Sequence, residues 1–373
     1  MKILISRKDI RDTLSGAPRN VLRHSELFVA NGHSVYVIAE KLDRSIISAS
    51  GATPVKTFKF PISGYFGRKF YQKRVSAWVK RNKPDLVIGH GDIVTQDVCS
   101  MHNCSHLAHE RIYGVPLPES DAVGRIHKEV LTEGAYRLLL CNSRMMKDDF
   151  IKRFNINPDK ICVIYPEVEL LCFDAPDPSK IRAEMRKKFN IGANEKVISL
   201  ITSGNFKKRN ADGLIRAFAL LRGNGGGANI RLFIAKGDYK ELIPLAEKVG
   251  ARERVIFAPA ERDIKKYYYM SDIFVLPARF EEFGRSVLEA MYCNLPALAS
   301  KWVGASEIFE GRARDFILNE NTPEEIAAKL KYMLNSPDEM AKLGEINKNT
   351  ALKYSSDILM KRFYNLIKEK GIL

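Results

Sequence analysis

Short apolar runs recur along the chain, and segments with helical spacing separate them. Strands are predicted over Lys2–Ser6, Ser34–Ala39 and Asp85–Gly89, and a helix over Asn20–Asn31 between the first two strands. Gly32 follows that helix directly and is a typical C-cap residue. Buried strands that alternate with helices are characteristic of a parallel α/β sheet. The first part of the chain therefore predicts one such sheet.

The same alternation appears a second time in the second half of the chain. Strands are predicted over Lys196–Thr202, Ile230–Ala235, Val255–Ala258 and Ile273–Leu276, and helices over Asp212–Leu221, Glu241–Val249, Ile264–Met270 and finally Ser355–Lys370. A length of 373 residues agrees with two or three domains. The polar, proline-bearing stretch Phe173–Lys180 is predicted to link them. We therefore expect two doubly wound α/β domains that face a cleft.

The composition excludes a disordered chain and a membrane-spanning one. Apolar residues make up 45% and charged residues 28%, which is ordinary for a protein with a packed core. No apolar run approaches the roughly 20 residues that span a bilayer, and the N-terminus lacks the apolar stretch of a signal peptide. Six cysteines without a CxxC pair predict free thiols in a reducing cytoplasm. We expect a cytoplasmic protein, soluble or peripheral to a membrane.

Positive charge is concentrated in one short stretch. The net charge is +16, and residues 41–83 hold eleven Lys and Arg residues against the single acid Asp43. Such a stretch suits nucleic acid, anionic lipid or a phosphorylated acceptor. All seven histidines lie within the first 127 residues, which indicates that the two halves carry different chemistry.

The most informative segment is Pro277–Ser300, in which a strand, a loop and a helix follow one another. The loop carries Glu281 and Gly284, and the helix that begins near Arg285 carries Glu289. The first turn of a helix offers unpaired N–H groups and a positive dipole end, which suit a diphosphate. Glycine allows the backbone to approach a ligand closely. Glu289 could then accept hydrogen bonds from ribose hydroxyls, and Glu281 from sugar hydroxyls. An ordinary strand–helix junction with solvated glutamates is the alternative.

The complete pattern, E-x-F-G-x4-E-A-M followed by N-L-P-A-L-A-S, resembles the retaining nucleotide-sugar glycosyltransferases of family 4. The resemblance covers nearly the whole chain, is strongest over residues 197–310, and extends to lipopolysaccharide-core enzymes. It implies the GT-B fold and three parts: residues 1–173 bind the acceptor, residues 174–353 bind the nucleotide-sugar, and residues 354–373 form a helix that crosses back to the first domain. It also implies transfer without a metal or another cofactor.

The resemblance carries further residues to the donor site. It assigns Glu281 to catalysis and Glu289 to the ribose, and it places the diphosphate against cations in the loop after the first strand of the second domain and against the helix tip. The residues concerned are Lys208, Arg209, Phe283, Gly284, Arg285 and Ser286. Asn205 stands where the family usually has Arg. Near the N-terminus the family has a glycine-rich loop. This chain has Ser15 where a first glycine is common, and only Gly16 remains. A plain turn is the alternative there.

The segment Gln96–Glu110 gathers three histidines and two cysteines. A zinc site is one interpretation, but the spacings match no usual finger. The resemblance points instead to His102, at a strand end, as a catalytic residue that bonds a donor hydroxyl or activates the acceptor. Asp97 and His90 are weaker candidates, and ordinary surface histidines remain the alternative.

A basic, aromatic-rich segment, Ile62–Lys83, predicts a membrane or acceptor surface. Its candidate residues are Arg68, Lys69, Lys73 and Arg74. A solvated helix is the alternative, and no nucleic-acid-binding motif supports contact with nucleic acid.

Taken together, these features predict retaining transfer of a hexose, with a UDP-sugar favoured, to a saccharide or lipid-linked acceptor in envelope polysaccharide or lipopolysaccharide synthesis. A nucleotide-sugar epimerase and a basic nucleic-acid-binding protein are the alternatives.

Overall fold

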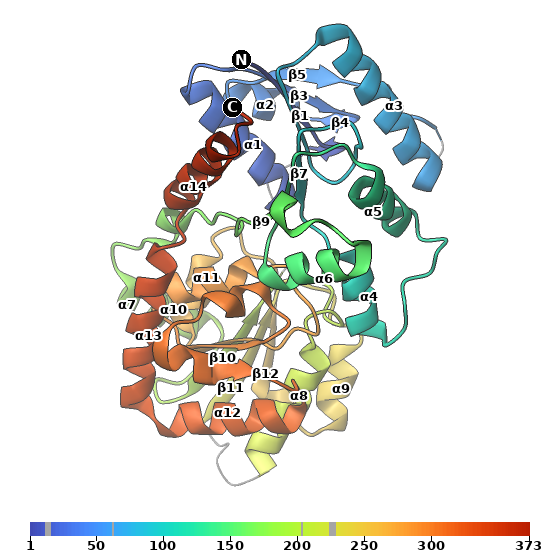
Figure 1. Ribbon diagram of the computed structural model, residues 1–373. Helices are drawn as coiled ribbons and strands as arrows, with labels where there is room; N and C mark the ends of the chain where they lie inside the picture. Colours follow the sequence, from blue (N-terminus) through green and yellow to red (C-terminus); the bar gives the residue numbers. More distant parts are fainter. Residues whose placement is uncertain (12–15, 62, 203, 224–228) are drawn as a thin grey trace. The chain divides into compact units, whose positions relative to one another are not determined.

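The computed structural model describes residues 1–11, 16–61, 63–202, 204–223 and 229–373 (Figure 1). The chain divides into two compact units. The first comprises Met1–Glu167 and Asp357–Leu373, and the second comprises Val168–Ser356. The stretch Phe173–Lys180, predicted as a linker, lies within the second unit. Its proline starts helix α7 (Pro178–Lys188), which Asp177 caps, so the polar residues there are a helix start.

Seven parallel strands form one sheet in the described part of the first unit, in the order β5-β3-β1-β6-β7-β8-β9. Their bounds are β1 (Lys2–Ser6), β3 (Ser34–Ala39), β5 (Thr53–Lys56), β6 (Leu86–Gly89), β7 (Val98–Met101), β8 (Leu138–Cys141) and β9 (Ile161–Val163). The helices are α1 (Gly16–Ala30), α2 (Arg44–Ala49), α3 (Gly64–Asn82), α4 (Ser105–Tyr113), α5 (Ala122–Glu133), α6 (Arg144–Phe154) and α14 (Ser356–Glu369). Strands β2 (Asp9–Ile10) and β4 (Lys41–Leu42) form a separate parallel pair.

Helices cover both faces of this sheet. On one face α1 and the C-terminal helix α14 pack together, and Phe28 and Phe363 meet edge to face in a core that also contains Ile3 and Ile5 (Figure 1). On the other face α3 contributes the buried Tyr71. Strands buried on both faces need the unbroken apolar runs that the sequence shows.

The second unit repeats this architecture. Its described residues form a six-stranded parallel sheet in the order β12-β11-β10-β13-β14-β15. The strands are β10 (Lys196–Ile201), β11 (Ile230–Ala235), β12 (Val255–Ala258), β13 (Ile273–Leu276), β14 (Ala297–Ser300) and β15 (Ile317–Leu318). After α7 the helices are α8 (Ala211–Leu221), α9 (Leu242–Lys248), α10 (Lys265–Met270), α11 (Arg285–Tyr292), α12 (Pro323–Asn335) and α13 (Pro337–Leu352). The predicted fold class, two parallel α/β sheets, is confirmed.

His24 gives the first unit a titratable group in its core. The imidazole lies parallel to the ring of Phe363 at 4.0 Å between centroids, and burial lowers its pKa from 6.5 to about 3. An unfolded chain therefore binds more protons at this site whenever the pH lies between these two values. The stability that neutral His24 contributes is complete above pH 6.5 and is lost progressively as the pH falls.

We expect replacement of His24 by Phe to flatten the acid side of the stability profile. In the wild type this histidine adds a slope of about 1.4 kcal/mol per pH unit below pH 6.5, and Phe can keep the stack on Phe363. Urea unfolding at pH 5.0, 6.0 and 7.0 checks this in a Trp302→Phe background, where Trp78 alone reports on the first unit. Equal slopes for the two proteins would contradict the assignment.

Candidate functional site

Glu281 is fixed by the backbone of a neighbouring loop. It lies beyond the end of β13, its N–H donates to the carbonyl of Trp302 at 2.8 Å, and its own carbonyl accepts from Gly304 N–H at 3.0 Å. Both partners follow β14, the strand beside β13 in the sheet. Ligands of open α/β sheets bind outside the carboxyl ends of the strands. The carboxylate of Glu281 is therefore held at the edge of the sheet where a ligand is expected.

Gly284 shapes the junction between this loop and α11. It precedes the first helical residue, Arg285, and has φ of +94° and ψ of +63°. A Cβ atom at this position would lie 2.8 Å from Val303 Cγ1. Both facts require glycine. Of the residues predicted to bind the donor here, Arg285 and Ser286 open the helix and are half-buried, whereas the Phe283 ring is buried in the core.

Replacing Gly284 with Ala should destabilise the second unit by about 2–5 kcal/mol. The left-handed backbone costs a residue with a Cβ about 1–2 kcal/mol, and the overpacked contact with Val303 adds about 1–3 kcal/mol. The double variant Gly284→Ala/Val303→Ala removes the contact but keeps the backbone cost, so it should recover part of the loss. Thermal unfolding of both proteins checks this; an unchanged midpoint for Gly284→Ala would contradict the strain.

The predicted basic loop lies between β10 and α8. Lys208 Nζ is 2.6 Å from Glu282 Oε2, and Arg209 Nη2 is 2.8 Å from Glu281 Oε2. Asn205 stands in the left-handed region with φ of +49°, and its side-chain oxygen accepts from Lys208 N–H at 3.0 Å. Asparagine tolerates this backbone and caps turns in this way. The departure from the family's usual Arg therefore has a local structural role.

An ion pair to the start of α8 holds the basic loop in place, and no sequence pattern predicted it. Both guanidinium Nη atoms of Arg279, at 2.9 and 2.7 Å, donate to the carboxylate of Asp212 at the start of α8. The backbone N–H of Arg279 also donates to the carbonyl of Lys208 at 2.9 Å. The two partners are 67 residues apart, so only the fold brings them together.

The structure brings two cations and two carboxylates together in a largely buried cluster. The side chains of Lys208, Arg209, Glu281 and Glu282 are each 13–16% exposed. Desolvation raises the pKa of Glu281, although Arg209 and Lys208 oppose that shift. One buried oxygen of this carboxylate, Oε2, has no well-aligned hydrogen bond and is held to Arg209 by charge alone. The cluster balances its own charges and keeps both cations oriented at the edge of the sheet.

Glu289 lies on α11 with its carboxylate only partly buried. Its Oε2 atom accepts a hydrogen bond of 2.7 Å from the hydroxyl of Tyr268, a residue of α10 that is fully buried. Burial and the neighbouring Glu289 both raise the pKa of Tyr268 well above 10, so the phenol stays protonated and donates. Tyr268, which sequence reasoning missed, fixes one oxygen of Glu289.

In the first unit, His102 follows β7 and His90 follows the neighbouring strand β6. His90 Nδ1 lies 2.8 Å from His102 Nε2, and Ser100 Oγ lies 3.4 Å from the same nitrogen. Gly16 is the first residue of α1, whereas Ser15 lies outside the described residues. Asp97 accepts from Val87 N–H at 2.8 Å through its side chain and so has a structural partner.

The predicted surface patch on α3 divides into two pairs. Arg68 Nη1 is 2.8 Å from Asp92 Oδ1, and Lys69 Nζ is 2.7 Å from Glu129 Oε2. Lys73 and Arg74 are exposed. Phe66, about two turns earlier on the helix, is 68% exposed.

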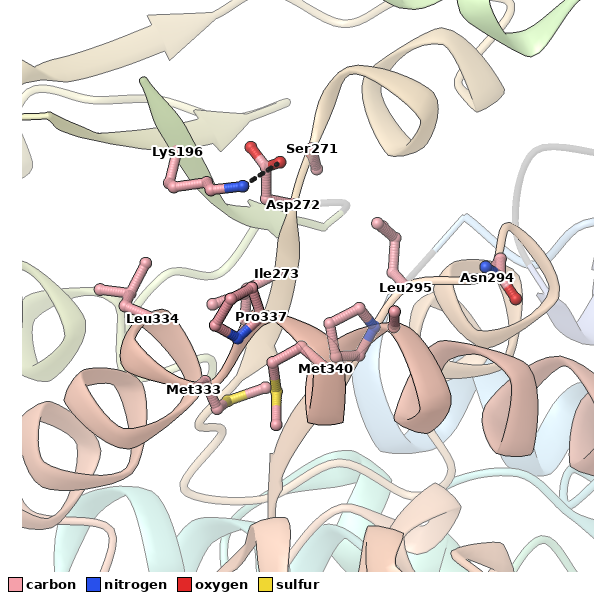
Figure 2. A pocket seen from close by; sticks show the side chains of 12 residues that line it. Lys196, Ser271, Asp272, Ile273, Asn294, Leu295, Met333, Leu334, Pro337 and Met340 are labelled. Carbon is pink, nitrogen blue, oxygen red and sulfur yellow. Dashed lines mark ion pairs between the residues drawn. The ribbon is translucent and has the colours of Figure 1, made fainter. Parts of the chain in front are cut away.

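One cavity of the described residues lies away from these groups, and two kinds of feature are absent from the same residues. A cavity of about 250 Å³ occupies the opposite edge of the second sheet, where Lys196 and Ile273 begin their strands and Met333 and Met340 line the wall (Figure 2). Among the residues that the structure describes, no cluster of three or more His, Cys, Asp and Glu side chains could hold a metal ion. Within the same residues, no helix is long and apolar enough to cross a bilayer.

Comparison with known families covers both units. The family "Glycosyl transferases group 1" matches residues 182–350, and "Glycosyltransferase Family 4" matches residues 14–170. D-inositol 3-phosphate glycosyltransferase of Rhodococcus jostii is 25% identical over 55% of this chain and 46% of its own length. The enzyme of the same name from Mycobacterium sp. strain KMS is 28% identical over 50% and 41%. The chain thus aligns with about half the length of these relatives.

Solved structures match nearly the whole chain. WaaG, described as a glycosyltransferase involved in lipopolysaccharide biosynthesis, has a TM-score of 0.77 at 18% identity and covers 98% of this chain and 99% of its own. Anabaena HepE, solved in complex with UDP-glucose, has a TM-score of 0.77 at 16% identity and covers 99% and 100%. These likenesses confirm the predicted GT-B fold.

Proposed function

Because this chain belongs to the family 4, group 1 glycosyltransferases, we propose that it transfers a hexose with retention of configuration from a UDP-sugar to an acceptor hydroxyl. One observation carries the proposal: Lys208 and Arg209 are oriented by Glu281 and Glu282 at the edge of the sheet where α11 begins. The charge of a diphosphate fits two converging cations beside a helix N-terminus.

The donor would lie against the second unit. Its diphosphate takes Lys208, Arg209 and the N–H groups at the start of α11, and Glu289 accepts from the ribose hydroxyls. Tyr268 supports this role because its hydrogen bond to Oε2 holds the Glu289 carboxylate in one orientation. A uracil base is favoured because the similar Anabaena HepE structure is described as a complex with UDP-glucose.

The reaction would replace one bond at the anomeric carbon with another on the same face of the sugar. The bond from C1 to the diphosphate oxygen breaks as the bond from C1 to the acceptor oxygen forms, and the acceptor proton passes to an oxygen of the departing diphosphate. Lys208 and Arg209 offset the charge that develops on the leaving group. Glu281 holds the sugar hydroxyls, and no metal or other cofactor takes part.

The ribose assignment is tested by calorimetric titration with UDP, GDP and ADP. We expect UDP to bind most tightly and Glu289→Ala to lose about 10-fold or more in UDP affinity, since hydrogen bonds to a charged group contribute about 1.5–3 kcal/mol. Glu247→Ala, which changes an exposed glutamate of α9, is the matched control. Equal UDP affinity for Glu289→Ala and the wild type would reject the ribose role.

We further propose that the acceptor binds at the first unit and is anionic or lipid-linked. The similar proteins point to two classes of acceptor, since one group is named for an inositol phosphate and WaaG for lipopolysaccharide biosynthesis.

The epimerase alternative predicts conversion of the donor alone. Incubating UDP-glucose with and without myo-inositol phosphate or lipopolysaccharide core, and analysing products by NMR, separates transfer from epimerisation.

The exposed side chains of α3 would rest on the anionic surface of a membrane's cytoplasmic face. Phe66, Phe70 and Arg74 are four residues apart and so share one helix face, and Arg74 lies 5.3 Å from the Phe70 ring centre. We expect the triple variant Phe66→Ser/Lys73→Ser/Arg74→Ser to lose most pelleting with phosphatidylglycerol vesicles. Lys331→Ser/Lys342→Ser, which removes two exposed lysines of the second unit, should pellet normally. Equal pelleting of both variants would overturn membrane contact.

A further inference from the structure

The pair formed by His90 and His102 is almost coplanar. The ring planes are within 13° of each other and the centroids are 5.0 Å apart, while the two facing nitrogens are 2.8 Å apart. Parallel rings stacked face to face could not bring nitrogens this close without overlap. The rings therefore lie nearly end to end, so an N–H on one ring points at the lone pair of the other.

The two rings must share one proton between these nitrogens, since two N–H groups or two lone pairs would repel each other. Neutral imidazole carries one N–H and one lone pair. Either His90 donates from Nδ1 and His102 accepts at Nε2, or the roles are reversed. The choice fixes which nitrogen of His102 carries its own proton.

The burial of His90 decides between these arrangements. Its side chain is 4% exposed, and among the described residues its Nε2 atom has no hydrogen-bond partner. If His90 accepted at Nδ1, its proton would sit on Nε2 as an orphaned buried donor. If it donates from Nδ1, only a lone pair remains at Nε2. In protein backbones, orphaned buried N–H groups are rarer than under-satisfied carbonyl oxygens, and we apply the same preference to this imidazole.

The groups around His90 also keep it neutral. Burial is the largest cause of a pKa far below 6.5, and the nearby His102, His24 and Arg7 lower it further. His24 comes from α1, with its ring centre 5.8 Å from that of His90, and Arg7 follows β1. A doubly protonated His90 would also leave a buried Nε2–H without an acceptor among the described residues.

We propose that His90 is a positioning residue that donates from Nδ1 to His102 Nε2 and so fixes His102 as the tautomer that carries its proton on Nδ1. Only the effect on catalysis rests on the proposed role of His102 in transfer. The tautomer of His102 does not depend on that role. Ser100 Oγ, 3.4 Å from His102 Nε2, can rotate its proton toward the same lone pair. His102 then carries its own proton on Nδ1, so that nitrogen is a hydrogen-bond donor and not an acceptor.

The assignment is tested by long-range ¹H–¹⁵N correlation on protein labelled at its histidines, at pH 7.5. The His102 signals are identified by their loss in His102→Asn. We expect wild-type His102 to show a protonated Nδ1 and an unprotonated Nε2. The opposite pattern would overturn the proposal without any variant of His90 being needed.

Two variants of His90 separate positioning from packing. Asn places an amide N–H close to the position of the Nδ1 donor, whereas Leu fills the space without a donor. His90→Leu should let His102 exchange between tautomers and lower kcat about 10-fold to 100-fold, the usual effect of losing a partner that orients a reacting histidine, with KM for UDP-glucose unchanged. His90→Asn should restore both the spectrum and most of kcat. Equal spectra for the Leu variant and the wild type would refute the positioning role.

The outcome for His102 itself is independent. If His102→Asn transfers sugar as fast as the wild type, its proposed catalytic role fails, while the tautomer seen in the spectrum still decides the role of His90.

Discussion

Replacing Arg209 with Ala is expected to lower kcat/KM for UDP-glucose by about 10² to 10³, the usual cost of removing one group that stabilises charge in a transition state. Arg209 is one of two cations at the tip of α11, and its side chain is 13% exposed. In such a partly dehydrated position its attraction to a diphosphate is stronger than at the surface. We expect the variant to lose part of the advantage of UDP over uridine, because only Lys208 and the first N–H groups of α11 then hold the diphosphate.

Arg209 also neutralises Glu281 at 2.8 Å. The Arg209→Ala substitution therefore disturbs the core as well as removing a phosphate contact, and the two effects must be measured separately. An unpaired buried carboxylate is costly. The double variant Arg209→Ala/Glu281→Gln removes that charge and should regain stability, but it should still bind UDP more weakly than Glu281→Gln alone. Arg216→Ala, at an exposed arginine of α8, is the matched control. If UDP retained its full advantage over uridine in Arg209→Ala, the phosphate role would be refuted.

Most strands were predictable from the sequence because their signal is local. The runs Lys2–Ser6, Ser34–Ala39 and Ile230–Ala235 are strands with those same ends. A strand buried on both faces must be apolar at successive positions, so its composition records its environment directly. The β13–α11 junction was predictable for a similar reason, since Gly284 marks a backbone that other residues adopt at a cost.

The linker was misplaced because its residues have two uses. Proline and aspartate occur in linkers, but they also begin helices, where proline needs no donor and aspartate caps the free N–H groups. In this chain Asp177 accepts from Lys180 N–H at 2.9 Å, and Asp174 accepts from the Tyr292 hydroxyl at 2.6 Å. Only the packing of that stretch onto the second unit distinguishes the two uses.

Two supporting residues of the site, Tyr268 and Arg279, were beyond the reach of the sequence, and His90 was named there only as a weaker catalytic candidate. All three act through contacts with residues 12 to 67 positions away. Their residue types are common in cores and on surfaces, and no spacing marks them. The candidate ligand-binding groups belong to short motifs, whereas the groups that orient them come from whichever element the fold places alongside.

Glu281→Gln should separate catalysis from nucleotide binding. The variant keeps the shape of the side chain but removes its charge, and we expect turnover to fall by about 10² to 10³, comparable to the loss of one preorganised polar group. UDP affinity should increase. The Glu281 carboxylate lies 2.8 Å from Arg209 and 3.9 Å from Lys208, so it competes with a diphosphate for both cations.

The pH dependence of binding gives this prediction a second readout. Burial raises the pKa of Glu281, so as the pH falls its carboxylate is protonated earlier than an ordinary glutamate and stops competing for Arg209. The effect of UDP ionisation is measured in Glu281→Gln and subtracted. After this correction, the UDP affinity of the wild type should increase toward that of the variant as the pH falls from 7 to 5. Glu247→Gln, at an exposed glutamate, should follow the wild type at every pH. Unchanged turnover in Glu281→Gln would show that the carboxylate does not hold the sugar. A constant difference in UDP affinity across this range would show that it does not compete with the diphosphate for the cations.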